Sequence, residues 1–143
     1  TYMNKKKRTA IISALIAMGC SFSASADEIL EADMRSHMAS GALQMPLSLG
    51  MADFARRLAP MECEYFLELA DLSLEMAGRG LSLQEIMAMN ANAGEPTFIE
   101  EFILRQEDFR ENGPTARIKA RIVLEVDGSC QNAVESLLRE AQQ

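Results

Sequence analysis

The sequence predicts an all-α protein, a single small domain of five or six helices stapled by one disulfide. Two observations support the helical class: apolar residues recur at intervals of three and four, and proline and glycine residues separate these segments. The third observation concerns the three cysteines. Cleavage of an N-terminal export signal would leave two of them, and two cysteines in an exported chain typically form a disulfide.

Residues 1–26 have the layout of a bacterial signal peptide for Sec-type export. Residues 5–8 are basic, residues 10–19 are apolar except for Ser13, and residues 24–26 supply the small side chains of a cleavage site. The apolar run is shorter than the roughly 20 residues that cross a membrane. We therefore expect residues 27–143 to form a helical domain in the periplasm or outside the cell. Alternatively, Gly19-Cys20 ends a lipoprotein signal, and a lipid on Cys20 tethers the protein to a membrane.

The predicted domain is strongly acidic. The formal net charge is −7, and cleavage after residue 26 would make it −11, because residues 1–26 hold four basic side chains and no acidic one. The negative net charge argues against nucleic acid or an anionic membrane as partner, since both attract basic surfaces. Half of the basic residues after residue 26 lie between 105 and 121. They either pair with neighbouring carboxylates or form a local docking patch.

Two helices are predicted before Pro60. Asp27 is a candidate N-cap of the first helix, which Pro46 ends. Its apolar stripe consists of Leu30, Met34, His37, Met38, Gly41 and Met45. The second helix is short, and its apolar face holds Leu47, Met51, Phe54 and Leu58.

The third predicted helix has the clearest pattern. Pro60 suits its first turn, and Gly78 and Gly80 end it. Cys63 shares a face with Phe66, so its sulfur is expected to point into the core. An acidic stripe and an apolar stripe run beside each other, made of Glu64, Glu68, Asp71 and Glu75 and of Tyr65, Leu69, Leu72 and Met76.

Two further helices are expected before residue 112. Ser82 and Glu85 have the spacing of a capping box, which starts a short helix. Pro96 starts the next one, in which Glu101 and Arg105 are placed to pair at i, i+4. Its aromatic stripe consists of Phe98, Phe102 and Phe109, and Asn112-Gly113-Pro114 ends it.

Residues 115–126 fit two kinds of structure. Ile118, Ile122 and Val126 recur every four residues, which is typical of a helix. The same segment also alternates apolar and polar residues, which is typical of a strand. A lone strand would have no partner within the chain, so the pattern favours a helix, and a strand would imply pairing with another chain.

The last predicted helix follows Gly128, which ends the preceding segment, and begins at the cap residue Ser129. Cys130 lies on its inward face together with Val134 and Leu137. Cys63 and Cys130 are thus both expected to face the core near helix starts. The sequence therefore predicts a Cys63–Cys130 disulfide.

No catalytic pattern can be recognised. His37 is the only histidine and lies on an apolar stripe, and the chain has no Gly-x-Ser-x-Gly motif and no glycine-rich phosphate loop. Most carboxylates lie on solvent-facing stripes. We therefore expect a protein that is not an enzyme and uses no cofactor.

Methionine is unusually frequent, with eight of the ten methionines after residue 26. Thioethers bind Cu(I), and Met34, His37 and Met38 share one helical face, so a periplasmic copper-binding protein is the alternative function. Methionine more commonly fills cores or lines adaptable binding surfaces. We expect Met34, Met38 and Met45 to form the surface that binds a partner, while the same stripe also fits a core.

One short segment resembles a known family. Cys63-Glu64-Tyr65-Phe66-Leu67 is similar to the Cys-Glu-x-Phe-Leu stretch of HdeA-like acid-stress chaperones, which are small exported helical proteins with one disulfide. This chain has a longer gap between its cysteines and is more acidic than those lysine-rich proteins. The resemblance implies the Cys63–Cys130 pair and no other residue role.

The general layout is also similar to that of exported helical immunity proteins, without a shared motif. We expect a small exported helical protein that binds another protein, as a chaperone or as an inhibitor. The identity of that protein is open, and a homodimer is compatible with the pattern.

Overall fold

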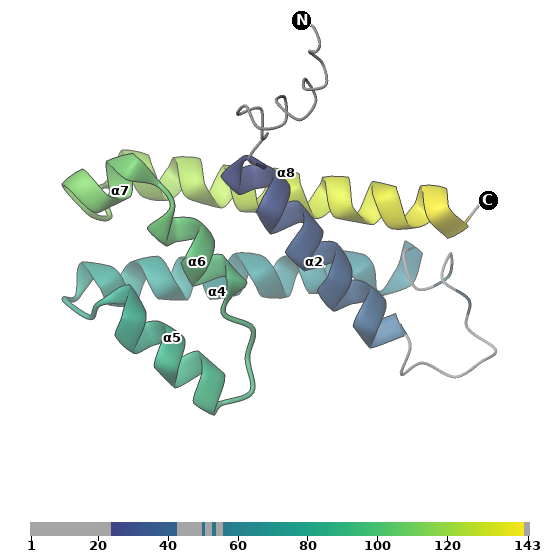
Figure 1. The fold of residues 1–143 in the computed structure, drawn as a ribbon, viewed down its shortest axis with the longest axis horizontal. Coiled ribbons are helices and arrows are strands. Elements are labelled where there is room, and N and C mark those ends of the chain that lie inside the picture. The colour runs from purple at the N-terminus through teal and green to yellow at the C-terminus, as the bar shows by residue number, and fades with distance from the viewer. Residues whose placement is uncertain (1–23, 43–49, 51–52, 54–55, 142–143) are drawn as a thin grey trace, which may run out of the picture.

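The structure is a computed structural model that describes residues 24–42, 50, 53 and 56–141 (Figure 1). Within these residues the regular structure consists of six helices without a strand, which confirms the predicted all-α class. The helices are α2 (Ala26–Ala42), α4 (Ala59–Gly78), α5 (Leu83–Asn92), α6 (Phe98–Leu104), α7 (Glu107–Asn112) and α8 (Ala116–Ala141). None of these helices is both long enough and apolar enough to cross a membrane.

Several predictions fall on other parts of the chain. Residues 1–23, with most of the predicted signal peptide and Cys20, lie outside the described residues. The same holds for Met45 and for most of the predicted second helix. These expectations therefore stay predictions.

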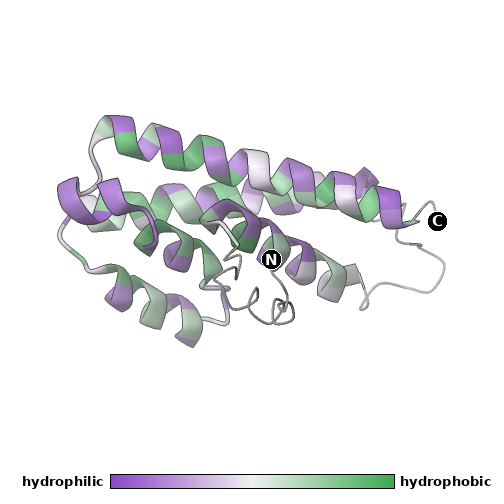
Figure 2. Ribbon diagram, turned by 45° about the horizontal axis from the view of Figure 1, so that its top comes forward, coloured by the Kyte–Doolittle hydropathy of each residue, from purple (hydrophilic) through white to green (hydrophobic). Residues whose placement is uncertain are grey.

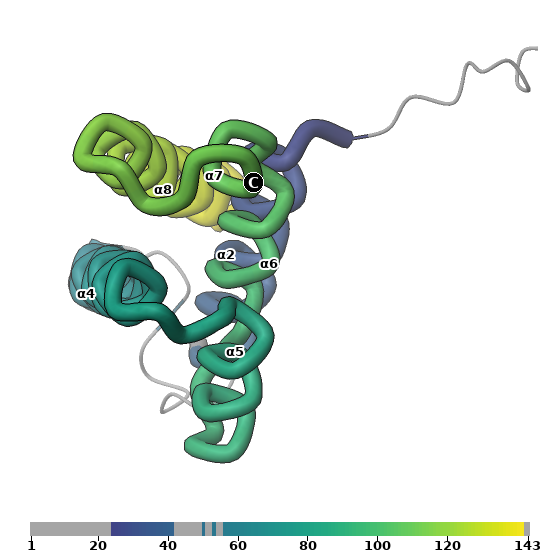
Figure 3. Tube along the Cα trace, turned by 90° about the vertical axis from the view of Figure 1, so that its left-hand side faces the viewer, coloured from purple at the N-terminus to yellow at the C-terminus, as the bar shows by residue number. Residues whose placement is uncertain are grey.

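The two longest helices, α4 and α8, run in opposite directions beside each other (Figure 1). Figure 3 shows that they form one side of the molecule, while α2, α5 and α6 form the other. A disulfide joins Cys63 of α4 to Cys130 of α8, with a Cα–Cα distance of 5.7 Å. This confirms the predicted pair.

The hydrophobic core lies between these two sides. Its largest fully buried side chains come from every described helix except α7, and they are Phe66, Phe102, Leu30, Met34, Met38, Leu74, Ile86, Ile99, Ile103, Ile122 and Leu137. Burying a side chain of this kind contributes roughly 1.5–3 kcal/mol to folding. The predicted inward position of Cys63 is confirmed, since it belongs to the same cluster.

Helix α8 resolves the ambiguity at residues 115–126 in favour of the helix. Ile118, Ile122 and Val126 are buried, whereas Leu124 is 71% exposed, as one face of a helix requires. The predicted break at Gly128 is wrong, because α8 continues to Ala141. Its buried face runs on through Cys130 and Leu137, and this packing outweighs the roughly 1 kcal/mol that one glycine costs inside a helix.

The single helix predicted after Pro96 is instead two helices, α6 and α7, separated at Arg105 and Gln106. The backbone of Gln106 is extended, and its side-chain amide donates to the Phe102 carbonyl oxygen at 3.1 Å. Arg110 likewise donates to the Leu104 carbonyl oxygen at 2.6 Å. The Phe102 carbonyl also accepts from the Arg105 backbone N–H at 3.1 Å, whereas the Leu104 carbonyl at the end of α6 gains its partner from Arg110. The predicted Glu101–Arg105 ion pair is not found among the described residues.

Two helices begin with a reciprocal capping box. At α5 the predicted box is confirmed: the Glu85 backbone N–H donates to Ser82 Oγ at 3.1 Å, and the Ser82 N–H donates to Glu85 Oε1 at 2.8 Å. At α2 the N-cap is Ser25 and not Asp27, because Ser25 and Glu28 exchange the same two bonds at 3.1 and 2.8 Å. The sequence interpretation missed this cap because Ser25 was assigned to the cleavage site.

The disulfide is expected to supply a large share of the stability. Replacing both Cys63 and Cys130 with alanine should lower the free energy of unfolding by roughly 4 kcal/mol, because the bond joins residues 67 positions apart. Guanidinium denaturation followed by circular dichroism measures this loss. A reducing agent should destabilise the parent protein equally and leave the double variant unchanged, and an unaltered midpoint in either test would contradict the expectation.

Candidate functional site

The predicted methionine surface lies in the core. Met34 and Met38 are fully buried, so neither can contact a partner in this fold, and this part of the prediction is corrected. The apolar stripe of α2 packs against α8 and α6. Met34 and Met38 therefore belong to the core, which is the other role that the stripe also fitted.

The residues of the copper alternative share one face of α2, but they are not arranged as an open site. The His37 ring packs edge-on against Phe66 and Phe98, with ring centroids 5.5 and 5.9 Å apart. A metal ion would reach Met34 and Met38 only if the core opened. Across the described residues, no group of three or more His, Cys, Asp or Glu side chains is placed to hold a metal ion.

A buried polar pair that the sequence interpretation missed joins α4 to α6. Ser73 and Glu100 are both almost fully buried, and Ser73 Oγ donates to Glu100 Oε2 at 2.6 Å. Among the described residues, Glu100 Oε1 has no hydrogen-bond partner. Ser73 lies on the same face of α4 as Phe66 and Ala70, and this spacing is a weak indication that Ser73 is buried. Glu100 is one of two adjacent glutamates in the otherwise apolar α6, and a glutamate is not expected to be fully buried.

The Ser73–Glu100 pair does not have the parts of a catalytic centre. A serine nucleophile needs a base that takes its proton and a group that orients the base. Here the hydroxyl donates directly to a carboxyl group, and the His37 ring packs against phenylalanines instead. The pair is therefore a tertiary contact that fixes α6 on α4.

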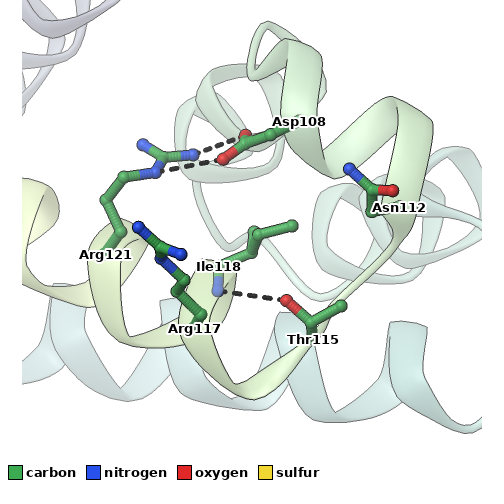
Figure 4. Close-up of a pocket in the computed structure, with 6 residues that line it drawn as sticks. All are labelled: Asp108, Asn112, Thr115, Arg117, Ile118 and Arg121. Atoms are coloured by element: carbon green, nitrogen blue, oxygen red, sulfur yellow. Dashed lines mark hydrogen bonds and ion pairs between the residues drawn. The ribbon is translucent and has the colours of Figure 1, made fainter.

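Arg121 ties α7 to α8 (Figure 4). Its guanidinium donates to both carboxylate oxygens of Asp108, at 2.6 and 3.2 Å, and also to Gln106 and Glu125. The expected pairing of the basic residues with carboxylates is thus confirmed for Arg121. A surface pocket of about 460 Å³ lies beside it, lined by Asp108, Asn112, Thr115, Arg117, Ile118 and Arg121.

Two carboxyl groups on α2 and α8 have raised pKa values. Burial raises the pKa of Asp33, the nearby Glu101 raises it further, and Arg105 partly offsets both. Burial also raises the pKa of Glu125, where the hydrogen bond from Arg121 acts in the opposite direction. Both groups therefore oppose folding when they are ionised.

A wide groove runs between α4 and α8 on their outer side. We call it the α4–α8 groove, about 710 Å³ in volume, and its lining residues are Asp71, Leu74, Glu75, Lys119, Ala120, Val123 and Leu124. Figure 2 shows hydrophobic and hydrophilic turns interspersed along α8. Leu124 is the most exposed of the large apolar residues that the structure describes. The groove is larger than the pocket beside Arg121.

Comparison with known proteins finds no match among family models, curated proteins or solved structures. The resemblance to HdeA-like chaperones is therefore neither supported nor excluded, and it stays a prediction.

The Ser73→Ala variant is expected to lose about 1–3 kcal/mol of stability, because the buried Glu100 carboxyl then has no partner for either oxygen. Adding Glu100→Met should restore most of the loss, since it replaces the stranded carboxyl with an apolar side chain of similar length. Urea denaturation of both variants measures the difference. A double variant less stable than Ser73→Ala would show that Glu100 is stabilised by some other contact.

Asp33→Asn should be more stable than the parent protein at pH 7. The raised pKa of Asp33 means that folding favours its protonated form, so this contribution is fully present below pH 3.8, its ordinary pKa, and is lost as the pH rises through the folded value. The neutral amide avoids that loss. Thermal unfolding should show an advantage at pH 7 that disappears near pH 3, and an equal difference at both values would contradict this.

Proposed function

We propose that this protein binds another protein outside the bacterial cytoplasm, in a chaperone-like or inhibitor-like role. The observation that carries the proposal is the α4–α8 groove, which leaves Leu124 exposed and Val123 partly exposed. An apolar opening with charged rims is the kind of surface that partner proteins cover. It replaces the methionine stripe as the candidate partner surface.

The disulfide supports the proposed location. Disulfides persist in oxidising compartments and are rare in the cytosol, so the Cys63–Cys130 bond favours an exported protein. The signal-peptide pattern of residues 1–26 points to the same compartment. The disulfide and the signal-peptide pattern both fit a periplasmic or secreted protein.

The Cys63–Cys130 disulfide also supports a binding role for a physical reason. Both walls of the groove are long helices, and the covalent link between Cys63 and Cys130 fixes their spacing. A preformed surface loses little conformational entropy when a partner docks. The proposed site is therefore rigid, in contrast to the adaptable methionine surface expected from the sequence.

Leu124→Gln is expected to weaken partner binding by at least tenfold, which corresponds to the loss of one central apolar anchor. Met89→Gln is the matched control, because Met89 is 49% exposed on α5 and lies outside the groove. Each tagged variant is used to capture proteins from the periplasmic fraction of the native host. Circular dichroism verifies that the fold is kept.

The parent protein and Met89→Gln should recover the same stoichiometric partner, and Leu124→Gln should lose it. The proposal fails if the parent protein recovers no partner, or if Leu124→Gln recovers the partner as well as the control does.

A further inference from the structure

One rim of the α4–α8 groove is acidic. Asp71 and Glu75 line the groove directly, and Glu64 and Glu68 continue the same stripe toward the start of α4. Residues at this spacing lie on one face of a helix. All four side chains are exposed. Lys119 is the one basic residue among those that line the groove.

Most of this acidic charge has no counterion within the described residues. Glu75 pairs with Arg79 at 2.8 Å, and both side chains are exposed. Glu64, Glu68 and Asp71 take part in none of the ion pairs found there. Like charges one turn apart on a helix repel each other. A partner that brings positive charge to this rim would relieve the repulsion.

We propose that the occupant of the α4–α8 groove is a basic amphipathic helix of the partner protein. Its apolar side chains would pack beside Leu124 and Val123, and its lysine or arginine side chains would face Glu64, Glu68 and Asp71. This inference rests on the proposed function and adds the chemical class of the partner.

Helical geometry supports a helix as the occupant. Residues 64 to 71 span about 10 Å along α4, because each residue of a helix rises 1.5 Å. Basic residues at positions i, i+4 and i+7 of a partner helix repeat the same spacing. Apolar residues on the adjacent stripe would then lie over the groove, as in other complexes where a helix occupies an apolar groove.

A second copy of this chain fits the rim less well. Its own α4 carries the same carboxylates, and the groove face offers only Lys119 as a counterion. Self-association is therefore an outcome that the test must detect, and it would overturn the inference.

Two synthetic 18-residue helical peptides serve as probes. Both carry leucine at the same positions, and their flanking positions are lysine in one peptide and glutamate in the other. Titration calorimetry with the oxidised full-length domain should show 1:1 binding of the lysine peptide and none of the glutamate peptide. Analytical ultracentrifugation of the domain alone reports any self-association.

Charge-matched variants separate the acidic rim from the net charge of the molecule. Glu64→Gln/Glu68→Gln should weaken binding of the lysine peptide by about three- to tenfold, as expected for two exposed ion pairs. Glu107→Gln/Glu111→Gln removes the same charge from exposed residues of α7 and should leave the affinity within about twofold. Leu124→Gln should weaken it as strongly as it weakens partner capture.

Three outcomes would each overturn the inference. They are equal losses of lysine-peptide affinity in the two charge-matched variants, peptide binding that Leu124→Gln does not change, and self-association that blocks the peptide. Partner capture that depends on Leu124 without lysine-peptide binding would refute the basic helix and keep the proposed function. Lysine-peptide binding in the groove without any captured partner would refute the proposed function instead.

Discussion

The covalent link between α4 and α8 is the constraint on which the rest of the structure depends. It joins the two longest helices in antiparallel orientation, and their inner faces form the wall against which α2, α5 and α6 pack (Figure 3). A domain of this size has a modest apolar core, so a bond that restricts the conformations of the unfolded chain has a large effect on stability. The same bond fixes the spacing of the two helices on the outside, where the α4–α8 groove lies.

Elements with strong local rules could be predicted from the sequence. Pro60 and the glycines after residue 77 bound α4, and the Ser82 capping box starts α5, because each rule depends on a few neighbouring residues. Residues 115–126 showed a helical and a strand-like period together. The helix was favoured because a lone strand would lack hydrogen-bond partners, and the exposure of Leu124 agrees with that argument.

Features that depend on tertiary contacts could not be predicted. Gly128 ends no helix because residues on both sides of it are buried against α2 and α4. The α2 methionines were assigned to the surface because an apolar stripe looks the same whether a core or a partner covers it. Burial of Glu100 follows from the packing of α6 against α4, and no local sequence pattern predicts it.

The proposed binding role depends on the exposed Leu124 side chain in the α4–α8 groove. Photo-crosslinking in the intact host tests most directly whether a partner covers the α4–α8 groove, using a photoreactive residue in place of Leu124 and, separately, of Met89. A partner adduct at position 124 that is absent at position 89 is the expected result. No adduct at position 124, or the same adducts at both positions, would contradict the proposed binding surface.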